Sequence, residues 1–440
     1  MSAVTHPQAG GTELTAVEER ILRSLDERYA IDLLKRLVAF PSYFPHYEEI
    51  AAFVEGEMRS YGLDVFVKGD SGTGQVESTA LAERALVYAE EFGEAMTRPW
   101  TRPNVVGSMK GTAGGPTLIM RAHTDVVPPY NLSLWKTDPF VPTEADGAIY
   151  GRGTADAKGS LAAMMAATRA VAASGVRLRG NLVLVAWVGD EFKPPDSRYF
   201  DGISYLAMND LIKGEMFIAG EPYDLHICPV TRGRIWFSIH VGGESTHGAN
   251  YPVKGINAIL QAYKLIQEIF QLPLGEHPLT GRDSINLGTI HGGKQPNIVP
   301  EDCHFTFDIR FAPPLTSAQI EQMVHERIQR LEATDPKFTV KSIQVTERRE
   351  PLEFPRDCQL TRAMLRAGRA VGRELQFGGA VSFGALASYK DRVGVKECVY
   401  FGPGETEQAH ATNERVLVAD VLVAAEVYAL TIAQVCGAHQ

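Results

Sequence analysis

The stretch TLIMRAHTDVVPP, residues 117–129, passes from an apolar segment directly into polar and proline-rich sequence. Its apolar half predicts a buried strand and its prolines predict a loop. Further apolar runs, NVVGSMKG from Asn104, NLVLVAWVG from Asn181 and MFIAGE from Met216, predict more strands. GSLAAMMAATRAVAASG, from Gly159, predicts a small-residue helix that packs closely on a sheet. Helices alternating with strands indicate an α/β fold with a mixed, mostly parallel sheet flanked by helices.

The first residues of the chain show helical periodicity. Val17, Ile21 and Leu25, at four-residue spacing, predict an opening helix that runs towards Phe40 and stops at Pro41. The other elements expected before residue 104 are a helix over 47–61, a strand over 63–68 and a helix over 76–97.

A different pattern begins near Cys228 and predicts an inserted α+β domain. Its expected strands are RIWFSIHVGG, SINLGTIHGG, DCHFTFDIRF and FTVKSIQV, and its expected helices cover residues 254–271 and 317–333. Residues 348–355, which contain two prolines, are interpreted as the return crossing. A helix near 416–435 closes the chain. The predicted domains are a discontinuous catalytic domain, residues 1–227 and 348–440, and an insert, residues 228–347.

Composition narrows the class of protein. The 440 residues are 45% hydrophobic and 22% charged, which is typical of a globular chain and excludes long disorder. The net charge of −10 and the lack of a long basic run argue against nucleic acid as a partner. No apolar stretch reaches the ~18 residues of a membrane span. Five scattered cysteines indicate neither a disulfide framework nor a zinc knuckle, so we expect a cytoplasmic protein.

Acids and histidines follow the predicted strands. His123 and Asp125 lie where the apolar half of the first quoted stretch passes into its proline-rich loop. His123 is either a metal ligand whose second ring nitrogen is held by Asp125, or a loop histidine capped by a nearby aspartate. Asp156 follows a Gly-rich turn, where a ligand or a helix N-cap is expected. Asp190 and Glu191 are adjacent at the end of another strand. They are expected either in a functional site or in a solvated turn. The last candidates are Glu221, in AGEP, and His410, in QAH.

Together these residues can form a metal site. Two imidazoles and three carboxylates suffice for two divalent cations if one carboxylate bridges them. Zinc suits such a mixture best, and manganese or cobalt are alternatives. Two such cations can share a hydroxide and polarise a carbonyl, with a neighbouring carboxylate as proton shuttle.

With these motifs the chain resembles the dinuclear metallohydrolase family of acetylornithine deacetylase, succinyl-diaminopimelate desuccinylase, aminoacylase and glutamate carboxypeptidase. The matching blocks follow in order over about 340 residues and include RAHTDVVPP, YGRGTADAKGSLAAMM, AGEP, GGESTHGA, QPNIVPEDC, FDIR and FGPG. The resemblance implies that His123 and Glu221 hold one metal, that Glu191 and His410 hold the other, and that Asp156 bridges them. It also implies a cis peptide bond after Asp156.

The chain departs from the family at the general base. Relatives usually carry two glutamates at the end of the third strand, the first as base and the second as ligand. The same alignment places Asp190 at the base position and Glu191 at the ligand position, because a frame shifted by one would make Phe192 a ligand.

By the same resemblance the insert is a lid and dimerisation domain, and the protein a homodimer. His247 is then expected to stabilise the oxyanion in the partner subunit's site, the alternative being local packing at a helix start. Asn297 and Arg310 match substrate-binding residues. An Arg fork suits a carboxylate, although Arg310 also has Asp308 nearby as a structural partner.

These inferences lead to one leading hypothesis. We expect a metal-dependent hydrolase of an amide or related C–N bond in a small carboxylate-bearing molecule, of deacylase or peptidase type. A metal-bridged water would lose its proton to Asp190, which would return it to the leaving amine. The alternative is a catalytically weakened relative that binds metal and ligand, and Asp190 is the feature that favours it.

Overall fold

A computed structural model of the chain describes residues 13–72, 99–112, 114–194, 197–380 and 386–439. The chain divides into two compact units. Unit 1 consists of Met1–Pro229, Phe354–Gly378 and Tyr389–Gln440, and unit 2 consists of Val230–Glu353 and Gly379–Ser388. The helix expected over residues 76–97 lies outside the described residues.

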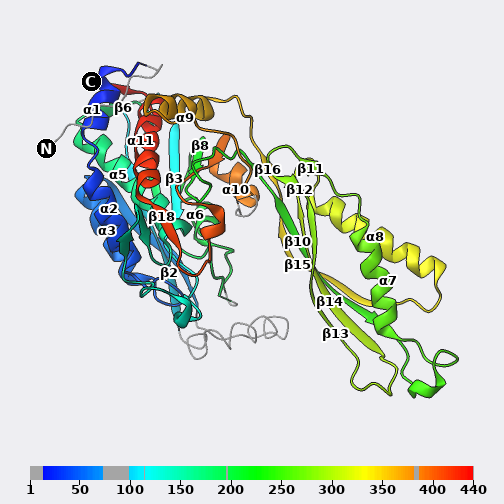
Figure 1. Cartoon of the computed structure of the whole chain (residues 1–440). Coiled ribbons are helices and arrows are strands. Elements are labelled where there is room, and N and C mark those ends of the chain that lie inside the picture. The colour runs from blue at the N-terminus through cyan, green and yellow to red at the C-terminus, as the bar shows by residue number, and fades with distance from the viewer. Residues whose placement is uncertain (1–12, 73–98, 113, 195–196, 381–385, 440) are drawn as a thin grey trace. The chain divides into compact units, whose positions relative to one another are not determined.

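Unit 1 is built on a six-stranded mixed sheet with the strand order β1-β2-β7-β3-β8-β17. Figure 1 labels its strands β2, β3 and β8. The strands β7, β3, β8 and β17 are parallel, whereas β1 and β2 pair antiparallel. Their bounds are β1 Asp64–Gly72, β2 Trp100–Met109, β3 Thr117–His123, β7 Asn181–Trp187, β8 Met216–Ala219 and β17 Glu397–Tyr400. This sheet confirms the predicted α/β class.

Helices pack around this sheet. They are α1 Ala16–Arg23, α2 Glu27–Val38, α3 Glu48–Ser60, α5 Gly159–Ala173, α6 Gly202–Met208, α9 Gln359–Ala370 and α11 Val418–Val435. A further helix, α10 Leu386–Val393, has its first residues in unit 2 and its last residues in unit 1. The prediction of one continuous opening helix is wrong, because the chain forms α1 and α2 instead. The carboxylate of Asp26 accepts the Tyr29 N–H at 3.0 Å and thereby starts a new helix.

The core of unit 1 lies between α5, α11 and the sheet. Small side chains on α5 allow α11 to pack against it, and Ala163 and Ala167 are fully buried. α11 is long and apolar enough to cross a membrane, but 67% of it is buried inside the protein. Its apolar character is therefore explained by packing in this core.

Shorter strands complete unit 1. β4, β5 and β18 form one small sheet, and β6 pairs with β19. Their bounds are β4 Thr143–Ala145, β5 Ala148–Tyr150, β6 Arg177–Leu178, β18 Arg415–Leu417 and β19 Ala438–His439.

Unit 2 is a four-stranded antiparallel sheet, order β13-β14-β10-β15, with helices α7 and α8 packed against it. The bounds are β10 Gly233–Gly242, β13 Ser284–Gly292, β14 Asp302–Phe311, β15 Val340–Arg349, α7 Ala258–Phe270 and α8 Ser317–Thr334. Alternate residues of β10 and β14, such as Phe237 and Phe305, form its core. Its short strands are β9 Val230–Thr231, β11 Glu276–His277, β12 Gly281–Arg282 and β16 Leu352–Glu353.

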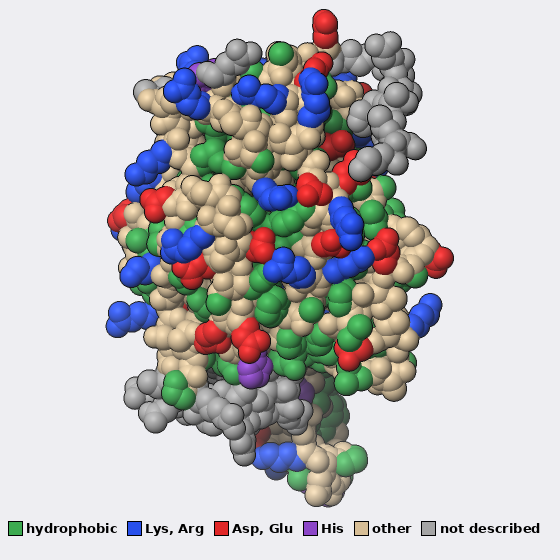
Figure 2. Space-filling model, turned by 90° about the vertical axis from the view of Figure 1, so that its left-hand side faces the viewer, with side chains coloured by type: hydrophobic (Ala, Val, Ile, Leu, Met, Phe, Trp, Pro, Cys, Tyr) green, Lys and Arg blue, Asp and Glu red, His purple; other side chains and the backbone are tan. Residues whose placement is uncertain are grey.

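Figure 2 shows the left-hand side of the view in Figure 1. Lys and Arg side chains are interspersed there with Asp and Glu side chains, so the described residues of this face form no continuous basic patch.

Candidate metal centre

Three parallel strands of unit 1 carry candidate ligands at or just beyond their carboxyl ends. β3 ends at His123, β7 leads into Glu191 and β8 leads into Glu221. Because β7, β3 and β8 are adjacent, these side chains reach the same edge of the sheet. Gly220, which precedes Glu221, lets the backbone lie close to α5, because a Cβ at this position would be only 2.8 Å from Ser160 Cβ.

Asp156 lies in a short irregular turn, η3 (Thr154–Lys158), that leads into α5. Its peptide bond to Ala157 is cis, as the resemblance implied. Gly153 precedes the turn with a φ of 84°, in the left-handed region that favours glycine. The N-cap of α5 is Lys158, so the alternative interpretation of Asp156 as a helix cap is wrong.

The buried carboxylate of Glu414 holds this turn. It accepts main-chain N–H groups from Gly153 (2.8 Å), Ala155 (2.9 Å) and Asp156 (3.0 Å). Arg152 donates its Nη1 to the same carboxylate at 2.8 Å. Glu414 therefore places Asp156 through its backbone and leaves the Asp156 side chain available.

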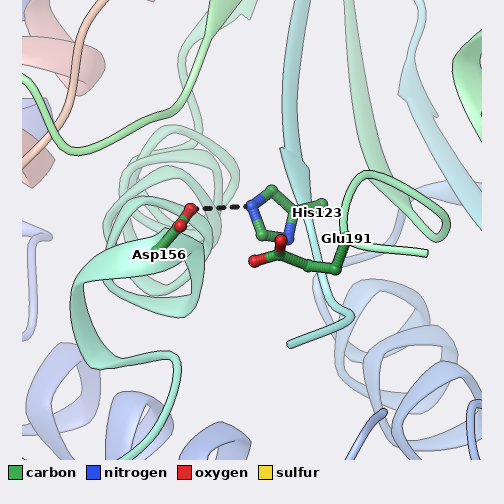
Figure 3. A group of neighbouring side chains, drawn as sticks. All are labelled: His123, Asp156 and Glu191. Atoms are coloured by element: carbon green, nitrogen blue, oxygen red, sulfur yellow. Dashed lines mark hydrogen bonds and ion pairs between the residues drawn. The ribbon is translucent and has the colours of Figure 1, made fainter. Parts of the chain in front are cut away.

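Asp156 directs one carboxylate oxygen towards each histidine. Oδ1 is 3.0 Å from His123 Nε2, and Oδ2 is 3.5 Å from His410 Nε2. Beyond each histidine lies another carboxylate: Glu191 Oε2 is 2.9 Å from His410 Nε2, and Glu221 Oε2 is 3.7 Å from His123 Nε2. Figure 3 shows His123, Asp156 and Glu191 converging on one space. The five side chains thus form two ligand groups that share Asp156.

Several oxygens of this cluster are buried without a hydrogen-bond partner. They are Oδ2 of Asp156, Oε1 of Glu191 and Oε2 of Glu221. Buried carboxylate oxygens need a donor or a cation to balance the loss of water. The side chain of His410 is 55% exposed, so the cluster opens to solvent there. These residues fit divalent cations held by nitrogen and oxygen ligands.

The pKa values of the cluster show how strongly its charges interact. Burial and the negative charge of Asp156 raise the pKa of Glu191 to about 8. Burial raises the pKa of Glu221 to about 7. The hydrogen bond to Glu191 raises the pKa of His410 to about 9. Protons and cations therefore compete for these ligands near neutral pH.

Asp190 lies in the same electrostatic environment. Its negative charge adds to burial in raising the pKa of Asp125 and of Glu221. Within the part of the chain that the structure describes, Asp190 makes no hydrogen bond or ion pair.

Asp125 holds His123 differently from the sequence-based expectation. Its main-chain oxygen, rather than its carboxylate, is hydrogen-bonded to His123 Nδ1, at 2.8 Å. The carboxylate is 3.7 Å from that nitrogen because its Oδ2 accepts the Glu191 N–H at 3.0 Å. Asp125 is therefore hydrogen-bonded both to His123, in one ligand group, and to the backbone of Glu191, in the other.

The residues predicted on the insert lie in unit 2. His247 is the N-cap of a short helix, η4 (Gly248–Asn250), where its Nδ1 accepts the Ala249 N–H at 3.1 Å. The main-chain oxygen of Asn297 accepts the Gly248 N–H at 2.8 Å, so these two loops are neighbours. Arg310 Nε donates to both carboxylate oxygens of Asp308, at 2.8 and 3.0 Å. The structural partner considered for Arg310 is therefore present.

Sequence reasoning missed three charged residues that contact the cluster. Arg152 and Glu414 are described above, and Arg121 donates its Nη1 to Glu221 Oε1 at 3.1 Å. A charged residue inside the apolar run TLIMRAH was a signal for Arg121.

Comparisons with known proteins identify the family of the chain. Residues 119–434 match the model of "Peptidase family M20/M25/M40". Acetylornithine deacetylase of Photorhabdus laumondii is 29% identical over 321 residues, 71% of this chain and 77% of the relative. Acetylornithine deacetylase of Myxococcus xanthus is 29% identical over 345 residues, covering 76% and 84%.

Solved structures share the fold. Aminopeptidase PepT of Bacillus cereus superposes with a TM-score of 0.70 at 20% identity, over 94% of this chain and 99% of that one. An M20 family metallo-carboxypeptidase of Sulfolobus solfataricus gives a TM-score of 0.69 at 16% identity, over 92% and 98%. The chain belongs to the M20/M25/M40 peptidase family.

Proposed function

We propose that this protein, a metal-dependent hydrolase of C–N bonds in small molecules, binds two divalent cations. His123 and Glu221 hold one, Glu191 and His410 hold the other, and Asp156 bridges them. The observation that carries the proposal is the division of the Asp156 carboxylate, one oxygen facing each histidine. Zinc is the cation proposed first, with manganese and cobalt as alternatives.

The chain's own residues account for the proton transfers. When bound, the cations supply the positive charge that acidifies a water molecule and polarises the scissile carbonyl. Asp190 accepts the proton of that water and returns it to the leaving nitrogen. Because Nδ1 of His247 is occupied, its Nε2–H remains to stabilise the oxyanion in the partner subunit. Asn297 and Arg310 bind the substrate.

The substrate we propose is a small carboxylate-bearing amide, of deacylase or peptidase type. The relatives named acetylornithine deacetylase favour an N-acyl amino acid as the first choice. The Nη groups of Arg310 suit a carboxylate, because its pairing with Asp308 uses Nε.

We also propose that the protein is a cytoplasmic homodimer that associates through unit 2. Large apolar side chains are exposed on α7 and on the edge strand β13, namely Leu260 (45%), Tyr263 (55%), Phe270 (50%) and Ile290 (47%). All five cysteines are buried and unpaired, which suits a reducing compartment. If His247 acts in the partner's site, mixed His247→Ala and Asp190→Ala subunits regain activity. Absence of complementation despite subunit exchange would place His247 in a local role.

A substrate screen tests the activity. Protein loaded with zinc, manganese or cobalt in turn is assayed against N-acyl amino acids, dipeptides and aromatic amides, with the chelator-treated protein as control. The proposal predicts hydrolysis that requires the metal and releases a free amine. Bound metal without turnover across this panel would instead favour a catalytically weakened metal- and ligand-binding protein.

A further inference from the structure

Arg121 is a charged residue in the interior of the central sheet of unit 1. It lies in β3 two residues before His123, and therefore on the same face of the strand. β7 and β8 flank it, with Val185 and Ala219 as its register partners. Only 2% of Arg121 is exposed, and a charge buried to this extent needs a partner of opposite sign.

That partner is the candidate ligand Glu221. Nη1 of Arg121 lies 3.1 Å from Glu221 Oε1, and Glu221 is fully buried. The guanidinium carbon lies 4.9 Å from the ring centre of Trp187, 5.7 Å from that of Tyr400 and 5.9 Å from that of Phe217. These aromatic contacts hold the guanidinium in place, and the guanidinium in turn fixes Oε1 of Glu221.

The two oxygens of Glu221 consequently have different surroundings. Oε1 is occupied by Arg121, whereas Oε2 has no hydrogen-bond partner and lies 3.7 Å from His123 Nε2. In the other ligand group, Glu191 has no Arg or Lys partner among the described residues. Its Oε2 is 2.9 Å from His410 Nε2 and its Oε1 is unpartnered. The carboxylates of Glu221 and Glu191 therefore differ in their charged partners and in the freedom of their oxygens.

We propose that Arg121 is a positioning residue that restricts Glu221 to one-oxygen coordination and weakens cation binding between His123 and Glu221. The inference rests on the proposed two-cation function. A fixed positive charge on a carboxylate opposes a second positive charge on the same carboxylate. One-oxygen coordination also leaves a ligand position for water or substrate, which a catalytic metal needs.

The test replaces Arg121 in the full chain, stripped of metal and titrated with cobalt(II) by calorimetry and visible absorption. Arg121→Met removes the charge and the bond to Oε1. Arg121 also lowers the pKa of Glu221, so its loss increases competition by protons. After correction for the protons released on binding, we expect one of the two cations to bind about tenfold or more tightly, since the repulsion is lost. We also expect a lower absorptivity of the cobalt form, because Glu221 then coordinates through both oxygens. A residue with a merely structural role would instead weaken binding when replaced.

Two further variants separate charge from geometry and from folding. Arg121→Gln keeps an N–H for Oε1 without the charge, so tighter binding with unchanged absorptivity is expected. Arg366→Met breaks an ion pair with buried Glu18 outside the cluster and should leave both affinities unchanged. If the wild type binds two cations but both Arg121 variants bind them with unchanged or weaker affinity, this inference is overturned and the proposed function is not. Fewer than two cations in the wild type would overturn the proposed function.

Discussion

Replacing Glu414 by alanine tests how the Asp156 turn is held in place. Its carboxylate accepts three main-chain N–H groups and Nη1 of Arg152, at 2.8–3.0 Å, and is 1% exposed. Removing one partner of a buried ion pair costs ~3–5 kcal/mol, and each unsatisfied N–H costs ~1–3 kcal/mol. Water that enters the vacated space can accept hydrogen bonds from the three N–H groups, so their cost is largely removed. The loss of the ion pair then sets the expected decrease in the free energy of unfolding, ~4 kcal/mol.

The same change should affect the metal site. With the turn no longer anchored, Asp156 is misplaced, and cation affinity should fall at least about tenfold. Urea titration followed by circular dichroism measures stability, and calorimetry measures the affinity. Glu18→Ala, which breaks the partly buried pair with Arg366, is the matched control. It should lower stability and leave cation affinity unchanged. A stability loss below ~1 kcal/mol for Glu414→Ala would refute this reasoning, as would an equal loss of affinity in the control.

Other changes separate the roles of neighbouring residues. Asp190→Asn should keep both metals and reduce turnover by ~10²-fold or more, whereas Glu191→Gln should lose metal. Normal turnover of Asp190→Asn at full metal occupancy would contradict the role of Asp190 as general base. Metal affinity should rise with pH, because protons held by Glu191 (pKa about 8) and His410 (pKa about 9) must leave first. Calorimetry in buffers of different ionisation enthalpy measures that release, and a pH-independent affinity would contradict it. Burial raises the pKa of Glu426 from 4.5 to about 7, so folding becomes less favourable as pH rises between these values. Glu426→Gln should therefore raise the melting temperature at pH 8 and leave it unchanged at pH 4.

Strands were more predictable than helix boundaries. An apolar run that ends in polar residues defined β3 correctly, because burial of such a run and its exit to the sheet edge are local properties of the sequence. The start of α7 was predicted at Lys254 but lies at Ala258. The chain before it pairs Ile256 with Glu244, and the Asn257 side chain caps the helix. Pairing with a distant segment is not visible in local periodicity.

The candidate ligands were predictable in kind, because acids and histidines follow buried strands in the sequence. Their supports were not, since Arg121 and Glu221 are separated by 100 positions and Arg152 and Glu414 by 262. The prediction for Asp125 concerned its side chain, which lies 3.7 Å from His123 Nδ1, whereas the shorter contact of 2.8 Å comes from its main-chain oxygen, which any residue carries. Sequence patterns report side-chain chemistry and leave such long-range and main-chain contacts unspecified.

The number of cations bound per chain tests the central claim most directly. Metal-free full-length protein is equilibrated with zinc, freed of excess metal and analysed by elemental analysis, beside Asp156→Ala. We predict two zinc ions per chain for the wild type. We predict fewer than one for the variant, because the shared carboxylate belongs to both ligand groups. One ion or none in the wild type, or two ions in Asp156→Ala, would contradict a dinuclear centre bridged by Asp156.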